Sequence, residues 1–246
     1  MSFITKNNGQ FVYFDAQLQN PIWRGKHVLD FGGNVGNILH HPTSTIDHDR
    51  YWCIDVSGEA IAAGQKAAPE AHFVFYDRYN FEYNPNGIRD LPIPEMRYKF
   101  DFILALSVFT HTGKAEMIEI VNHLRGFLND GGQLAFSFFD PHYLPQDSDT
   151  SNLKYYFQQR ARDLSAREID ASTNKASGAS WCTLPNGTLE IENEGLERLQ
   201  GVQEGEGYLA FYTPAYLKTI FPQAKILEPV SPFPRQHCCI IDESPR

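Results

Sequence analysis

The sequence lacks the features that mark several large classes of protein. Its four cysteines show neither the spacing of a zinc site nor a disulfide framework. No apolar run is long enough to cross a bilayer, and residues 1–6 do not resemble a signal peptide. The Lys and Arg residues form no cluster, and the net charge is −9. These absences predict a cytoplasmic protein that acts on a small molecule or a peptide, without contact to membranes or nucleic acids.

The chain does contain enough apolar material for a sizeable core. Its 246 residues are 42% hydrophobic and 13% aromatic, which suits one α/β domain with elaborations or two small domains. An aromatic lead-in over residues 1–26 is expected to be partly helical. Apolar runs predict strands, and helical spacing predicts helices. The strands are expected over 28–29, 51–54, 72–76, 100–106, 133–139, 225–227 and 236–241, and the helices over 58–68, 117–128 and 215–221.

The segment from His27 to Asn37 carries the most specific signal. A short apolar run, Val28-Leu29, ends in Asp30 and then in a glycine-rich turn, after which Val35 begins a helical pattern. A strand, a tight turn and a helix N-terminus in this order are typical of a nucleotide-type site at the edge of an α/β sheet. Glycine is needed there because the backbone turns sharply and a ligand approaches without a Cβ in the way.

The glycine spacing separates two kinds of ligand. A dinucleotide fingerprint that began at Gly32 would place glycines at positions 34 and 37, which are both asparagine. The segment reads Asp-x-Gly-x-Asn-x-Gly from Asp30 to Gly36 instead. It resembles motif I of the class I S-adenosylmethionine (SAM)-dependent methyltransferases, which usually reads Asp/Glu-x-Gly-x-Gly-x-Gly. In this chain Asn34 replaces the middle glycine of that motif. Asn tolerates positive φ better than most residues, and an acid beside the loop suits the cationic amino and sulfonium groups of SAM.

A second acid lies where such a site needs one. Asp55 follows the apolar run 51–54, about 20 residues beyond the glycine loop, which is the expected place of the acceptor for ribose hydroxyls. A carboxylate suits this role because it accepts from two vicinal hydroxyls at once. Ser57 is expected to cap a helix that begins at Gly58, and Thr213, followed by Pro214 at the first helical position, is expected to cap the helix that contains 215–221.

Two further strand ends match the methyltransferase pattern. Asp77 and Arg78 follow the run 72–76, where an acid bonds the adenine amino group in enzymes of this class. The run 100–106 is nearly continuously apolar, as in a central parallel strand, and ends in Ser107-Val108-Phe109-Thr110-His111. This segment resembles the Ser-Val-Phe-Thr-His sequence of many small-molecule methyltransferases. The resemblance implies that the Ser107 backbone lies near the cofactor and His111 near the acceptor.

Two histidines are candidates for a catalytic base. His111 has a pKa range that suits proton abstraction from a hydroxyl, although a histidine there equally suits a cap of the following helix. His142 follows the run 133–139, at a carboxyl strand end where open α/β sheets bind ligands. A base is optional, because the sulfonium is already a strong electrophile and alignment with desolvation can supply most of the rate. No ligand set for a metal stands out, so none is expected.

The resemblance implies a single methyltransferase domain over residues 1–246. Its fold would be a Rossmann-like, seven-stranded, doubly wound and mostly parallel sheet with an antiparallel last strand. The long segment 144–207 would be an inserted cap over the acceptor pocket. The residues expected to bind SAM are Asp30, Gly32, Gly33, Asn34, Gly36, Asp55, Val56, Asp77, Arg78 and Ser107.

The implied reaction is methyl transfer from SAM to an O or N nucleophile of a small molecule, such as a natural product, or of a peptide. Two alternatives stay open. A nicotinamide-dependent oxidoreductase is disfavoured by the failed dinucleotide fingerprint and by the absence of a Tyr-x-x-x-Lys pair. A SAM-binding interaction domain without catalysis is kept open by the altered glycine of motif I. The sequence gives no basis for an oligomeric state.

Overall fold

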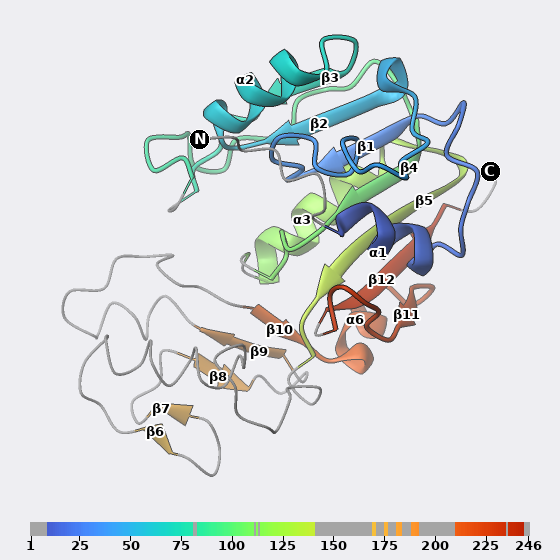
Figure 1. The fold of residues 1–246 in the computed structure, drawn as a ribbon. Helices are drawn as coiled ribbons and strands as arrows, with labels where there is room; N and C mark the ends of the chain where they lie inside the picture. Colours follow the sequence, from blue (N-terminus) through green and yellow to red (C-terminus); the bar gives the residue numbers. More distant parts are fainter. Residues whose placement is uncertain are drawn as a thin grey trace.

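A computed structural model describes residues 9–80, 83–110, 112, 114–140, 169–170, 175–176, 181–183, 188–191, 210–234 and 236–243. A seven-stranded sheet organises the chain, in the order β11-β12-β5-β4-β1-β2-β3 (Figure 1). The strands are β1 (Val28–Phe31), β2 (Tyr51–Asp55), β3 (His72–Phe75), β4 (Phe100–Ala105), β5 (Leu128–Phe138), β11 (Lys225–Leu227) and β12 (His237–Asp242). Strands β1 to β5 are parallel, whereas β12 runs antiparallel to both β5 and β11. The predicted α/β fold with an antiparallel end is thereby confirmed.

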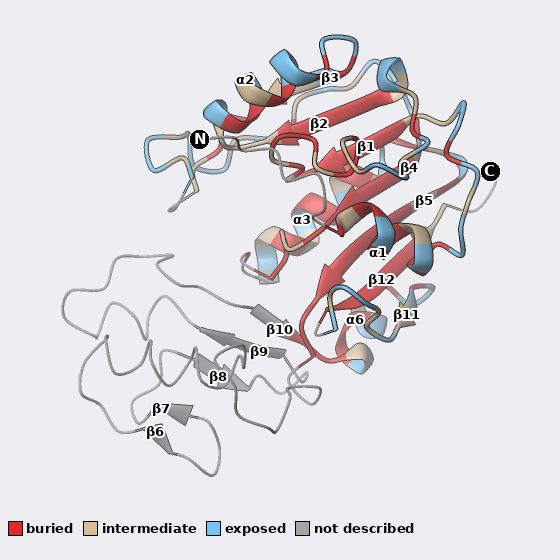
Figure 2. Ribbon diagram, in the orientation of Figure 1, coloured by how far each residue is buried: buried red, intermediate tan, exposed pale blue. Residues whose placement is uncertain are grey.

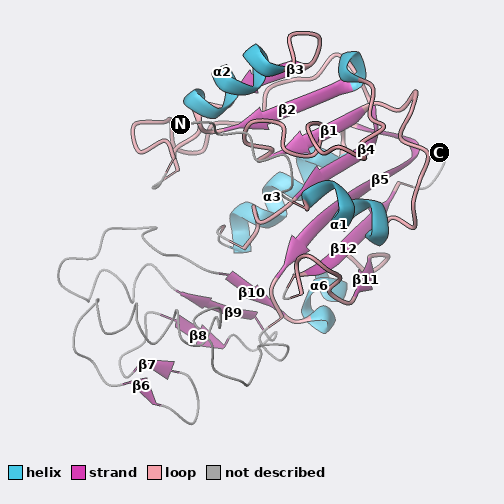
Figure 3. Ribbon diagram, viewed as in Figure 1, coloured by secondary structure: helices cyan, strands magenta, loops and turns pink. Residues whose placement is uncertain are grey.

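Helices cover both faces of this sheet (Figure 3). They are α1 (Gln10–Gln17), α2 (Gly58–Ala67), α3 (Lys114–Arg125) and α6 (Pro214–Ile220). Phe14 of α1 and Ile61 of α2 belong to the apolar cluster on one face, and Val121 of α3 and Leu217 of α6 belong to the cluster on the other. The central strands are therefore buried on both sides (Figure 2), which explains why they read as continuous apolar runs.

Two helix starts follow from capping residues in the sequence. The Ser57 hydroxyl accepts a hydrogen bond from Ala60 N at 3.3 Å, which fixes the start of α2. The Thr213 hydroxyl accepts from Tyr216 N at 3.1 Å at the start of α6. Pro214 occupies the first helical position there, where its missing N–H costs no hydrogen bond. Both predicted starts are confirmed.

The predicted helix after the glycine loop is absent. Between β1 and the short 3-10 helix His48–Arg50 the chain forms successive turns and no α-helix. Gly36 has φ +78°, a left-handed conformation that interrupts helical geometry after one turn. Pro42 then prevents the chain from resuming a helix, because the proline ring blocks the preceding turn. The prediction of a helix from Val35 is therefore wrong, although the turn that precedes it is in place.

The helix predicted over 117–128 also ends earlier than its apolar pattern indicated. Helix α3 stops at Arg125, and β5 begins at Leu128. Phe100 N donates to Phe127 O at 2.8 Å, so the chain joins the sheet directly after the helix. Gly131 and Gly132 lie within β5, where the register with β4 shifts.

Five short strands belong to the segment that follows β5. Three form an antiparallel sheet: β8 (Trp181–Thr183), β9 (Thr188–Ile191) and β10 (Ala210–Tyr212). The other two, β6 (Ile169–Asp170) and β7 (Lys175–Ala176), pair with each other. Tyr212 N donates to Phe139 O at 2.8 Å, which attaches β10 to the carboxyl end of β5.

Candidate functional site

The sheet reverses its winding between β1 and β4. From β1 the chain moves outward through β2 to β3, and it then returns to β4 on the other side of β1. In open α/β sheets, ligands bind at the carboxyl ends of the strands where the winding reverses. The loops that begin at Gly32, after Asp55 and at Ser107 all leave the sheet at this edge. The fold thus brings three separately predicted segments together.

The loop after β1 is fixed by backbone conformations that only glycine and asparagine adopt readily. Gly32 and Gly36 have φ values of +73° and +78°. Asn34 has a φ of +56°, so it takes the left-handed conformation expected of a residue that replaces a glycine. A Cβ at Gly32 would lie 2.4 Å from Val108 Cγ2. The glycine loop and the segment after β4 are therefore in direct contact.

Asp30 supports the glycine loop from beneath. Its side chain is buried, and Oδ2 accepts a hydrogen bond from the Tyr51 hydroxyl at 2.6 Å. A Cβ at Gly33 would lie 2.5 Å from the same oxygen. Burial raises the pKa of Asp30 to about 7, helped by the charge of Asp55 and opposed by the Tyr51 hydroxyl. A carboxyl group poised to ionise near neutral pH therefore lies under the loop.

Asp55 is held in place by the loop and by the helix that follows it. Its Oδ2 accepts from Asn34 N at 2.7 Å, and its Oδ1 accepts from Ser57 N at 2.8 Å. Burial raises its pKa, and these backbone N–H groups oppose that rise. Each carboxylate oxygen has a second lone pair, so both can accept a further hydrogen bond from a ligand. Val56, the next residue, packs partly buried against the cluster on the α3 face.

The two residues at the end of β3 point in different directions. Tyr76 N donates to Asp55 O at 2.9 Å, which holds this chain end beside Asp55, and Asp77 Oδ1 accepts from Asn84 Nδ2 at 3.0 Å. The Arg78 guanidinium turns toward α3 instead. It forms ion pairs with Glu116 at 2.9 Å and with Glu119 at 3.4 Å. A contact of Arg78 with the cofactor would therefore have to come from its backbone.

Ser107, at the end of β4, also has a left-handed backbone, with φ +57°. Its N–H donates to the Ser137 hydroxyl at 2.7 Å, and its own hydroxyl contacts the Gln236 amide. Sequence reasoning did not find Ser137 or Gln236 as site residues. The one local signal is a hydroxyl inside the otherwise apolar run 134–139, whereas the Ser107–Gln236 pair joins residues 129 positions apart.

The carboxyl edge also contains a buried histidine, His237, that no local sequence pattern singled out. His237 begins β12 opposite Phe138 and is buried. Its Nε2 is 3.3 Å from Glu228 Oε2. Burial lowers the pKa of His237, while the charges of Glu228 and Asp140 oppose the change. The predicted bases His111 and His142 lie outside the residues that the structure describes.

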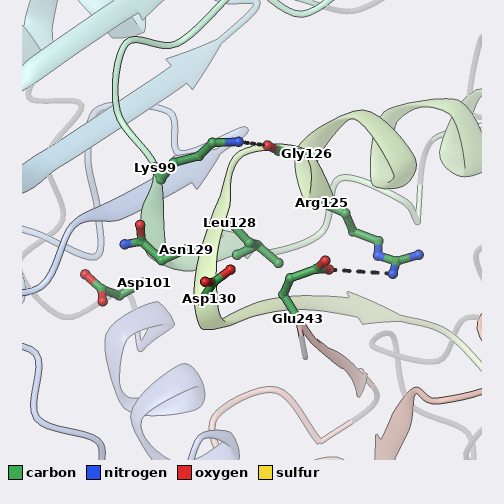
Figure 4. A pocket seen from close by; sticks show the side chains of 8 residues that line it. All are labelled: Lys99, Asp101, Arg125, Gly126, Leu128, Asn129, Asp130 and Glu243. Carbon is green, nitrogen blue, oxygen red and sulfur yellow. Dashed lines mark hydrogen bonds and ion pairs between the residues drawn. The ribbon is translucent and has the colours of Figure 1, made fainter. Parts of the chain in front are cut away.

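The pocket in Figure 4 lies at the other edge of the sheet. Its volume is about 510 Å³, and its lining includes Lys99, Asp101, Arg125 and Glu243. These residues lie where β4 and β5 begin and where β12 ends. None of the predicted site residues lines this pocket. The candidate site is therefore defined by the residues at the carboxyl strand ends, because the pocket lies at the opposite, amino edge.

The described ranges contain no group of three or more His, Cys, Asp or Glu side chains that could hold a metal ion. No helix in them is long and apolar enough to cross a membrane.

Comparison with known proteins shows which family model and which solved structures this chain resembles. Residues 29–134 match the family model of a methyltransferase domain. No curated protein matches the chain by sequence. Among solved structures, an amino pentose methyltransferase of calicheamicin biosynthesis from Micromonospora echinaspora, with SAM bound, is 12% identical; the match covers 95% of this chain and 90% of that one, with a TM-score of 0.56.

Two further structures share the fold. The CcbJ methyltransferase from Streptomyces caelestis is 11% identical over 98% of this chain and 91% of that one, with a TM-score of 0.53. Magnesium protoporphyrin IX methyltransferase from Synechocystis, with S-adenosylhomocysteine bound, is 14% identical over 95% and 80% of the two chains, with a TM-score of 0.51. Residues 29–134 thus match a methyltransferase domain, within a chain whose sheet has the fold of SAM-dependent methyltransferases.

Proposed function

We propose that the carboxyl edge around Gly32, Asp55 and Asp77 binds SAM, and that the enzyme transfers its methyl group to an O or N nucleophile of a small molecule or peptide. The observation that carries this proposal is the geometry of Asp55. Its two oxygens are oriented by backbone N–H groups of the glycine loop and of the α2 start, at 2.7 and 2.8 Å. A carboxylate held in this way presents both oxygens to a pair of vicinal ribose hydroxyls.

The chemistry of the edge fits SAM better than a dinucleotide. The three strand ends carry the carboxyl groups of Asp30, Asp55 and Asp77, which suit a ligand with ammonium and sulfonium charges. A pyrophosphate needs positive charge or free N–H groups at a helix start. The nearest guanidinium, that of Arg78, is committed to two glutamates on α3, and no helix follows the glycine loop. These observations disfavour the nicotinamide-dependent alternative.

Each strand end has a distinct task in this proposal. The glycine loop, from Gly32 through Gly33 and Asn34 to Gly36, lies against the methionine part of SAM, with Asp30 supplying negative charge nearby. Asp55 accepts from the ribose, and Val56 packs near the adenine. Asp77 accepts from the adenine amino group, and the backbone at Ser107 borders the sulfonium.

The protein mainly aligns and desolvates the reactants. Bound SAM supplies a methyl group that is already electrophilic. The residues around Ser107 then need only to hold the acceptor atom in line and exclude water. His111 and His142 remain candidates for the base that takes the acceptor proton. The segment 144–207 stays our proposed cap over the acceptor. Most of it lies outside the described residues, and the support is that β10, which follows it, attaches at the carboxyl end of β5.

A small-molecule acceptor is supported by the relatives with the same fold. Two of them act on an amino pentose and on magnesium protoporphyrin IX, as their names state. These names do not specify the methylated atom, so both O and N nucleophiles stay within the proposal.

Calorimetry with S-adenosylhomocysteine tests cofactor binding without knowledge of the acceptor. Asp55→Ala should weaken binding by about 1–3 kcal/mol, because charge-assisted hydrogen bonds to the ribose are lost. Asp101→Ala is the matched control, since it removes an aspartate at the opposite edge, and it should leave the affinity unchanged. Equal affinities of the two variants would contradict the ribose assignment. Binding of NAD in place of S-adenosylhomocysteine would overturn the function.

Activity separates an enzyme from a binding domain. SAM with an isotope-labelled methyl group, incubated with a panel of small amines, alcohols and peptides, should yield a labelled product. Binding without transfer to any member of a broad panel would favour the interaction-domain alternative.

A further inference from the structure

A buried hydrogen-bond network links the end of β4 to two distant elements. The Ser107 N–H donates to the Ser137 hydroxyl of β5 at 2.7 Å. The Ser107 hydroxyl accepts from Gln236 Nε2 at 2.8 Å and lies 3.1 Å from Gln236 Oε1. The Tyr13 hydroxyl of α1 donates to the carbonyls of Gln236 and His237, at 3.2 and 2.9 Å. Ser137 and Tyr13 are fully buried, so no water competes for these bonds.

The network surrounds a backbone conformation that needs external support. A serine at φ +57° is disfavoured, because its Cβ crowds the following carbonyl, and such a residue persists only where its surroundings over-determine it. Ser137 binds the Ser107 N–H and Gln236 binds the Ser107 hydroxyl, so Ser107 is held at both its backbone and its side chain. Gln236 is in turn fixed at its own backbone by Tyr13.

The conformation of Ser107 reaches the glycine loop through the next residue. Val108 Cγ2 would lie 2.4 Å from a Cβ at Gly32, so the two loops touch with no space between them. A change in the direction of the chain at Ser107 would move Val108 and, with it, the contact with Gly32. Ser137 and Gln236 therefore influence the glycine loop without lying in it.

We propose that Ser137 and Gln236 are positioning residues, which hold Ser107 in its left-handed conformation so that the loops after β1 and β4 are preformed for the cofactor. This inference rests on the proposed function, because it takes the surface that those two loops form together to be the SAM site. It adds that part of the affinity for the cofactor originates in β5 and at the start of β12, on side chains that do not touch the ligand. Preorganisation of this kind raises affinity by removing the cost of ordering the loops on binding.

The test compares S-adenosylhomocysteine affinity and thermal unfolding in the same variants. Ser137→Ala removes the acceptor of the Ser107 N–H, and its affinity should fall by about tenfold. Adding Ser107→Gly to Ser137→Ala should recover most of the loss, because glycine adopts positive φ without the Cβ penalty. Gln236→Leu, which keeps the Ser137 bond, should lower the affinity by a smaller factor, about threefold. Thr219→Val is the control, since it deletes a hydroxyl bond to Tyr216 O on α6, and it should not change the affinity.

The outcomes separate this inference from the proposed function. Rescue by Ser107→Gly supports a positioning role, because a purely structural defect would lower the unfolding temperature and would not be repaired by a glycine. Unchanged affinity in Ser137→Ala, or a loss that Ser107→Gly does not repair, overturns the inference while leaving the function intact. If Ser137→Ala does not fold, the affinity of Gln236→Leu for S-adenosylhomocysteine tests the inference in its place. An affinity of Gln236→Leu equal to that of Thr219→Val then overturns the inference. A wild-type protein that binds no S-adenosylhomocysteine would overturn the function and the inference together.

Discussion

The two edges of the central sheet differ in how their polar groups are held. At the carboxyl edge, Asn34 and Ser107 have left-handed backbones, and the carboxyl groups of Asp30 and Asp55 have pKa values raised by burial. At the amino edge, charged side chains surround an open pocket and are paired on the surface. Lys26 lies 3.1 Å from Asp101, with both side chains in contact with solvent.

This difference shows why volume alone is a poor guide to the site in this fold. Water can satisfy the exposed charges of the amino edge, so its pocket of about 510 Å³ does not require a ligand. The carboxyl edge keeps strained backbone and desolvated carboxylates, which are costly unless they serve binding or catalysis. Substitutions at the two edges should therefore differ in their effects on stability and on binding.

The largest effect is expected from Gly32→Ala, paired with Gly131→Ala. Both glycines have left-handed backbones, with φ values of +73° and +74°, so the backbone penalty is the same, about 1–2 kcal/mol. A Cβ at Gly32 would collide with Val108, whereas a Cβ at Gly131 meets nothing within 4 Å. Gly32→Ala should therefore lower the free energy of unfolding by about 3–5 kcal/mol in urea titrations. Equal losses in the two variants would mean that the loops after β1 and β4 are not in contact.

The buried ion cluster at the end of β3 gives the second prediction. Arg78 is buried and bonds Glu116, Glu119 and the carbonyl of Leu91, so Arg78→Met should lower the free energy of unfolding by about 2–4 kcal/mol. The glutamates are partly exposed, which keeps the loss below that of a fully buried cluster. Arg125→Met breaks only a half-exposed pair at the amino edge, and it should cost less than about 1 kcal/mol. Chemical denaturation of both variants checks the difference.

Arg78 also shows what the sequence could and could not predict. Local patterns were sufficient for the strand ends, the caps at Ser57 and Thr213, and the left-handed Asn34, because short-range sterics and hydrogen bonds determine them. The side of the sheet to which Arg78 turns depends on glutamates of α3 that are distant in sequence. The missing helix after the glycine loop has a local cause instead, because Gly36 and Pro42 outweigh the apolar pattern.

The residues around Ser107 illustrate the same dependence on distant residues at the proposed SAM site. The strand 100–106 and its position in the sheet follow from its apolar run, so the location of Ser107 was predictable. Its partners Ser137 and Gln236 come from other strands, and only the register of the sheet shows that they meet. His237 was missed for the same reason, since its proximity to the end of β5 results from an antiparallel pairing that no local motif encodes.

The third prediction uses the pKa of Asp30, which burial raises to about 7. Because the folded state holds the Asp30 proton more tightly than the unfolded chain does, protonation of Asp30 stabilises the folded state. This stabilisation is fully present below about pH 4 and is lost as the pH rises through 7. Binding of the cationic cofactor should show the opposite trend, because it requires the ionised form. SAM affinity should rise about tenfold between pH 6 and pH 8 in wild-type protein, whereas Asp30→Asn should give a flatter profile. A wild-type profile as flat as that of the variant would exclude Asp30 from the cation site.

The smallest effect is expected from an aspartate with the opposite shift. Asp242, at the end of β12 and so at the amino edge, has a lowered pKa, because hydrogen bonds from Lys225 at 2.6 Å and from Gln133 outweigh its partial burial. A lowered pKa contributes stability at neutral pH that is lost as the pH falls through the folded-state value. Lys225 is largely exposed, so Lys225→Met should cost at most about 1 kcal/mol at pH 7 and less at pH 3. Urea titrations of wild-type and variant protein at the two pH values measure this difference, and a cost that grows as the pH falls would contradict the assignment. Asp30 and Asp242 are the same residue type in one sheet, so opposite pH trends in Asp30→Asn and Lys225→Met would have to come from their surroundings. The difference between the two edges would then result from desolvation of Asp30 at the carboxyl edge and from the solvated pairing of Asp242 at the amino edge.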